Sequence, residues 1–127
     1  MTETGTAILV DGENISPTHA PRILGAAAAL APIRLARVYG HVPRINGWTT
    51  TAGFVPVHTT RAKDGADLVL AIEAVAQAHA PGITHLVIAT SDGGLAPLVH
   101  HLRAAGRSVL LLGEAKTPEA LRLAASR

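Results

Sequence analysis

The sequence has no cysteine, and it has one phenylalanine, one tyrosine and one tryptophan among its 127 residues. The absence of cysteine excludes disulfide bonds, a thiol nucleophile and a Cys-ligated zinc site. So few aromatic side chains provide few faces on which nucleic-acid bases can stack. A protein without cysteine agrees with a cytoplasmic location, where thiols stay reduced, and we expect that location here.

Long apolar runs and a strong charge of one sign are also missing. No run approaches the length of a membrane span, and residues 1–5 lack the features of a signal peptide, so we expect no membrane association. The formal charge of +2 is compatible with a polyanion partner and equally with an ordinary solvated surface. No dinucleotide fingerprint, phosphate loop or nucleophile elbow is present, so we expect no organic cofactor.

The sequence does contain apolar strands that alternate with helices. Its length and its apolar content of 48 % predict one domain over residues 1–127 with a substantial core. Strands are predicted at 6–10, 33–39, 54–58, 85–90 and 108–112, and helices at 17–30, 64–80, 95–105 and after Thr117-Pro118. The segment 40–51 is predicted to be a loop with a short turn around Trp48. This order indicates an α/β fold, a Rossmann-like three-layer α/β/α sandwich with a five-stranded, mostly parallel sheet.

Three carboxylates follow the predicted strands. Asp11 ends the first strand, Asp92 follows the fourth, and Asp67 lies in the first turn of the helix after the third. In an open parallel sheet these positions meet at the carboxyl edge, where ligands bind. Neighbouring carboxylates repel each other, and hard oxygen ligands suit Mg²⁺ or Mn²⁺. We therefore predict a divalent-metal site there.

Each aspartate also has a purely structural interpretation. Asp11 and Gly12 can form a turn, Asp67 can complete a capping arrangement with Asp64, and Asp92 can cap the helix that follows it. The adjacent His100 and His101 would point about 100° apart on a helix, which makes a histidine metal pair improbable. The combination of three acids at one edge, rather than any one of them, indicates the metal site.

The residues also resemble a known family, the NYN domains of the PIN-like nucleases. Residues 10–15 (VDGENI), 63–74 (KDGADLVLAIEA) and 90–93 (TSDG) with the helix after them are similar to its three motifs, in the same order. Residues 116–120 (KTPEA) are similar to the tail of the bacterial LabA-like subgroup. The resemblance spans nearly the whole chain.

The resemblance implies metal-dependent cleavage of RNA. Asp11, Asp67 and Asp92 would be the catalytic metal ligands. Asn14 would orient Asp11 or contact a substrate phosphate, and Ser91 would support Asp92.

Basic residues near the acidic edge are candidates for contacts with RNA phosphates. They are Arg44, Arg61 and Lys63. Ordinary solvated charge is the alternative interpretation of all three.

The sequence departs from the family pattern in two places. Gly94 and Leu95 stand where the third motif usually has a second acid and a phenylalanine, and the segment 48–53 is shorter than the usual second helix. Glu73 lies six residues after Asp67, about 240° around a helix. We therefore interpret Glu73 as a structural residue, paired with a basic side chain, rather than as a ligand.

Three functions remain open from the sequence. The first is a metal-dependent endoribonuclease that uses Mg²⁺ or Mn²⁺, and the second is a catalytically weakened or inactive RNA-binding or interaction domain, favoured by Gly94. A small phosphatase or nucleotide hydrolase is the third. A homodimer through an exposed Ala/Leu helix face is compatible with each of them.

Overall fold

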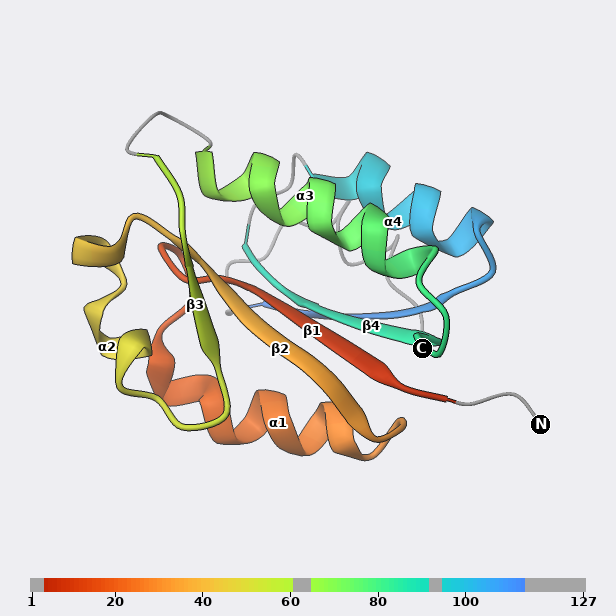
Figure 1. Cartoon of the computed structure of the whole chain (residues 1–127), viewed down its shortest axis with the longest axis horizontal. Coiled ribbons are helices and arrows are strands. Elements are labelled where there is room, and N and C mark those ends of the chain that lie inside the picture. Colours follow the sequence, from red (N-terminus) through yellow and green to blue (C-terminus); the bar gives the residue numbers. More distant parts are fainter. Residues whose placement is uncertain (1–3, 61–64, 92–94, 114–127) are drawn as a thin grey trace.

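A five-stranded parallel sheet forms the centre of the molecule (Figure 1). The computed structural model describes residues 4–60, 65–91 and 95–113. The strands are β1 (Thr6–Asp11), β2 (Ile33–Gly40), β3 (Val55–His58), β4 (His85–Ala89) and β5 (Ser108–Leu112). Their order is β3-β2-β1-β4-β5, and every neighbouring pair is parallel. The carboxyl ends of all five strands therefore lie along one edge of the sheet.

Helices cover both faces of this sheet, which confirms the predicted three-layer architecture (Figure 1). Helix α1 (Ala20–Ala28) lies on one face, and α3 (Gly65–Ala78) and α4 (Ala96–Ala104) lie on the other. The predicted last helix, after Thr117-Pro118, lies outside the described residues. None of the helices in the described ranges is long and apolar enough to span a membrane.

The helix predicted at 17–30 is interrupted near its start. Residues Pro17–His19 form a 3-10 turn, η1, before α1 begins. Pro21 has no backbone N–H to donate to the carbonyl of Pro17, and that carbonyl instead accepts the N–H of Ala20. A tighter 3-10 turn is the expected result of such a missing α-helical hydrogen bond.

The segment 40–51, predicted to be a loop with a short turn around Trp48, contains two short helical turns, η2 (Val42–Arg44) and α2 (Asn46–Thr49), and α2 is the turn around Trp48. Trp48 of α2 is 1 % exposed, and its ring meets Phe54 edge-on with 5.0 Å between ring centroids. Its indole Nε1 donates a 2.9 Å hydrogen bond to the carbonyl oxygen of Ile15. The segment after β2 is thereby fixed against the loop that follows β1.

Strand β1 is buried along its whole length. Ala7 and Leu9 belong to the core under α3 and α4, whereas Ile8 and Val10 belong to the core under α1. Side chains alternate between the two faces of a strand. Asp11, the next residue, is therefore directed toward the side of α3.

Candidate active site at the carboxyl edge

The carboxylate of Asp11 is held at the end of β1 by three hydrogen-bond donors. Asn14 Nδ2 lies 2.7 Å from Asp11 Oδ2, and the backbone N–H of Glu13 donates to Asp11 Oδ1 at 3.2 Å. The hydroxyl of Thr90, just after β4, lies 3.4 Å from Asp11 Oδ2. Asp11 itself is fully buried. Its side chain thus has a fixed orientation without direct contact with bulk water.

Asp67 meets Asp11 from the first turn of α3. The two carboxyl groups are within hydrogen-bonding reach of each other. Burial raises the pKa of Asp11, against the opposing effects of the hydrogen bonds from Asn14, Asp67 and the Glu13 backbone. Two neighbouring carboxyl groups favour a state in which only one of them is charged, because a second negative charge is unfavourable in a buried place. The structure therefore brings together two of the three predicted metal ligands.

The turn after Asp11 depends on the absence of a side chain at Gly12. A Cβ atom there would lie 2.7 Å from Val38 Cγ2 and 2.9 Å from Ile45 Cγ2. The N–H of Gly12 donates to the carbonyl of Tyr39 on β2 at 2.9 Å, and the N–H of Ile15 donates to the carbonyl of Asp11 at 2.9 Å. This tight turn places the side chain of Asn14 next to the carboxylate of Asp11.

Glu13 links this turn to the segment after β2. Its Oε2 accepts a 2.8 Å hydrogen bond from the backbone N–H of His41, and its Oε1 lies 3.3 Å from Arg44 Nη1. Arg44, predicted to contact RNA, is therefore paired with Glu13, although its side chain stays 55 % exposed. The pairing keeps the guanidinium on the carboxyl edge, near the acidic pair.

The remaining predicted site residues fall at the limit of the described chain. Ser91 follows Thr90 at the end of β4, and its Oγ is buried with no hydrogen-bond partner in the part of the chain that the structure describes. Asp92, Arg61 and Lys63 lie outside the described residues. Over 4–60, 65–91 and 95–113, no group of three or more histidine or acidic side chains is arranged to hold a metal ion.

Glu73 takes no part in the acidic pair. Its Oε1 lies 2.7 Å from Arg37 Nη1 and 2.7 Å from the hydroxyl of Tyr39, both on β2. The prediction that Glu73 is structural and paired with a basic residue is confirmed. Sequence reasoning did not identify Tyr39 as its second partner or Thr90 as a partner of Asp11. These contacts join β2 to α3 and the end of β1 to the residue after β4, and no local pattern in the sequence indicates them.

An apolar face of α3 is exposed beside the site. Leu68 and Ile72, one turn apart, are 62 % and 67 % exposed. A homodimer through an exposed helix face was predicted from the sequence, and this face is a candidate for it. The dimer stays a prediction.

Comparisons with known proteins give a family and a fold. The sequence model of the NYN domain matches residues 5–127. A crystal structure of a protein of unknown function from Vibrio parahaemolyticus superposes with a TM-score of 0.75 at 18 % sequence identity, covering 97 % of this chain and 90 % of that one. A search of functionally characterised proteins found no significant match. The structural likeness supports the three-layer α/β fold described above.

Proposed function

Because the chain belongs to the NYN domain family, we propose that it is a metal-dependent ribonuclease that hydrolyses RNA phosphodiester bonds. The observation that carries this proposal is the contact between the carboxyl groups of Asp11 and Asp67 at the carboxyl edge of the sheet. The family's PIN-like nuclease fold supports the general class, and this pair supplies chemistry suited to it.

The residues present fit a divalent cation. Asp11 is fully buried yet faces a second carboxyl group, and a cation would remove the repulsion between the two charges. The atoms that would bind the ion are carboxylate oxygens, which suit Mg²⁺ or Mn²⁺ better than softer metals. Asp11 and Asp67 would hold the ion, with Asp92 as the third ligand. When bound, such an ion neutralises charge on the phosphodiester and makes water a stronger nucleophile.

The protein's own side chains would prepare the site. Asn14 and Thr90 fix Asp11 Oδ2 from two sides, so the carboxylate needs no reorientation when its partners arrive. We assign phosphate contacts to Arg44 and, from the sequence, to Arg61 and Lys63. The buried Oγ of Ser91 is available to support Asp92 or a substrate oxygen.

A catalytically weakened RNA-binding domain is the alternative, because Gly94 replaces an acid that the family usually has. Loss of one preorganised polar group typically costs about 10²–10³ in rate. We therefore expect slow turnover rather than the rate of a complete four-acid site.

The deciding experiment compares cleavage of labelled single-stranded and structured RNA in Mn²⁺ or Mg²⁺ by the wild-type protein and by the double variant Asp11→Asn/Asp92→Asn. Glu73→Gln, which neutralises an acid that lies on α3 outside the site, is the control. We expect cleavage by the wild type and the control only. If the wild type cleaves no faster than the double variant in either metal, the hydrolase proposal fails. Salt-dependent RNA binding without turnover would then favour the alternative.

A further inference from the structure

A cavity of about 310 Å³ opens on the α1 side of the sheet, at the same carboxyl edge as the acidic pair. We call it the α1 cavity. Its apolar wall consists of Ile15, Ile23, Ala89 and Leu112, and His19 and Arg22 supply its polar groups. Its volume is at the lower end of the range for small-molecule sites. It therefore suits one compact unit rather than a long segment.

The α1 cavity and the acidic pair lie on opposite sides of the same strand ends. Ala89 faces the α1 core, while the next residue, Thr90, directs its hydroxyl to Asp11. Ile15 lines the cavity, and its N–H donates to the carbonyl of Asp11 at 2.9 Å. A strand of nucleic acid that crosses the carboxyl edge can therefore reach both places.

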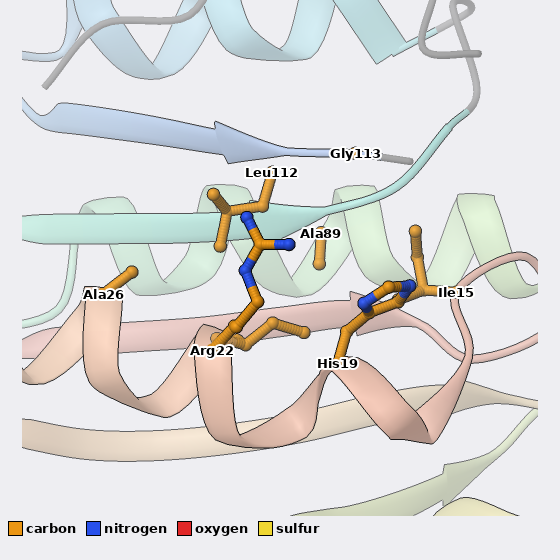
Figure 2. Close-up of a pocket in the computed structure, with 8 residues that line it drawn as sticks. Ile15, His19, Arg22, Ala26, Ala89, Leu112 and Gly113 are labelled. Carbon is orange, nitrogen blue, oxygen red and sulfur yellow. The ribbon is translucent and has the colours of Figure 1, made fainter. Parts of the chain in front are cut away.

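Among the residues that the structure describes, the polar side chains that line the α1 cavity are basic. Arg22 rises from α1 toward β4 and β5, and His19 lies beside it near Ile15 (Figure 2). Within residues 4–60, 65–91 and 95–113, Arg22 has no ion pair or hydrogen bond, and the first turn of α1 contains no acidic residue. A guanidinium over an apolar wall favours an anion that also carries an apolar body.

We infer that the α1 cavity binds one nucleotide of an RNA strand next to the phosphodiester held at the acidic pair. Arg22 contacts its phosphate, and its base lies against the apolar wall beside the His19 ring. RNA-binding proteins use histidine rings and arginine planes as surfaces for unstacked bases. This inference rests on the proposed function, because it assigns a subsite to the same RNA substrate.

The test is binding of a fluorescein-labelled single-stranded RNA, followed by anisotropy over a range of salt concentrations without divalent cations, so that no strand is cleaved. Arg22→Gln removes the charge and keeps a polar, flexible side chain. Ala26→Leu fills the cavity, which Ala26 also lines, without any change of charge. Arg103→Gln, an exposed position on α4, removes the same unit charge from the other face and is the matched control.

We expect Arg22→Gln to weaken binding about ten-fold and to reduce the slope of log K against log salt by about 0.7, the value for one phosphate contact with a single strand. Ala26→Leu should weaken binding by roughly five-fold with an unchanged slope, because it excludes the base rather than the phosphate. Arg103→Gln should leave the slope as in the wild type.

The subsite is overturned if Arg22→Gln keeps the wild-type slope, if Arg103→Gln lowers it equally, or if the wild type does not bind the RNA. Circular dichroism melting checks that each variant is folded. Failure of the ribonuclease proposal has a different signature, because a wild type without cleavage in Mn²⁺ can still show binding that depends on Arg22.

Discussion

Arg37 Nη1 lies 2.7 Å from Oε1 of Glu73, and this ion pair joins β2 to α3 across the edge of the core. The Tyr39 hydroxyl donates to the same oxygen at 2.7 Å. Glu73 belongs to the stretch of sequence that resembles the second family motif, but its contacts are with β2 and not with Asp11. Of the two acids in this stretch of α3, Glu73 thus attaches the helix to β2, whereas Asp67 belongs to the candidate site.

Replacement of Glu73 should therefore affect stability and leave metal binding intact. We expect Glu73→Gln to lower the free energy of unfolding by about 1–2 kcal/mol. A charge-assisted hydrogen bond is lost, but the Arg37 and Glu73 side chains are 38 % and 27 % exposed, which reduces its contribution. Chemical denaturation measures the loss. A Glu73→Gln protein with wild-type stability, or one that no longer responds to Mn²⁺, would contradict this assignment.

Tyr39, the only tyrosine in the sequence, donates a hydrogen bond to Glu73, so its ionisation can be followed by absorbance. Burial, and then the hydrogen bond and charge of Glu73, raise the pKa of Tyr39 well above its ordinary value. Because the folded-state pKa is higher than the unfolded one, the contribution to stability is complete below about pH 10 and is lost as the pH rises above it. We expect no tyrosinate absorbance at 295 nm near pH 11 while the protein is folded, and full ionisation in denaturant. Ionisation near pH 10 in the folded protein would show that Tyr39 is accessible.

The acidic pair should make stability depend on divalent cations. We expect Mn²⁺ to raise the melting temperature of the wild type. A ligand at 100 times its Kd stabilises the folded state by about 2.7 kcal/mol. Each kcal/mol raises the melting temperature of a chain of this size by roughly 3–5 °C. Asp11→Asn should abolish this rise, whereas Glu73→Gln should keep it. Differential scanning fluorimetry with and without EDTA measures both. An equal Mn²⁺ response in Asp11→Asn would place the ion elsewhere.

The Asp11→Asn variant also tests, in the absence of metal, whether Asp11 is buried. Burial raises the pKa of this carboxyl, so the unfolded chain loses its proton first as the pH rises above about 3.9. The free energy of unfolding therefore falls as the pH rises from that value to the folded-state pKa. In EDTA, the melting temperature of Asp11→Asn relative to that of the wild type should be higher at pH 7 than at pH 3, although the amide loses a hydrogen bond that the carboxylate accepts at both pH values. A difference of the same size at both pH values would indicate a cause other than ionisation.

Two glycines should respond to alanine in opposite directions. At Gly12 the added Cβ would lie 2.7 Å from Val38 Cγ2, so Gly12→Ala should destabilise the protein by about 1–3 kcal/mol. At Gly25, in the middle of α1, a Cβ meets nothing within 4 Å, so Gly25→Ala should stabilise it by roughly 0.5–1 kcal/mol. Urea denaturation of both variants measures the difference. Equal effects would mean that the turn after Asp11 can relax around a methyl group.

Much of the fold could be predicted from local pattern. The predicted strand at 108–112 has the observed bounds, and the other four differ by at most one residue at an end, because short apolar runs bounded by glycine or proline have few alternatives. The 3-10 turn at Pro17–His19 was missed, since it depends on the hydrogen bond that Pro21 cannot make. The turn predicted around Trp48 is observed as α2, which contacts of Trp48 with Ile15 and Phe54 stabilise, whereas the 3-10 turn η2 was missed.

The sequence by itself determined which strands exist, that they run parallel, and that Asp11 and Asp67 lie at their carboxyl edge. Periodicity and the β-α alternation are local properties of the chain, and parallel topology converts them into a shared edge. Only the tertiary structure decided the burial of Asp11, its hydrogen bond from Thr90, the partners of Glu73, and the cavity that contains Arg22. These features join residues far apart in the sequence, and strand register and helix packing, rather than any local pattern, determine which of them meet.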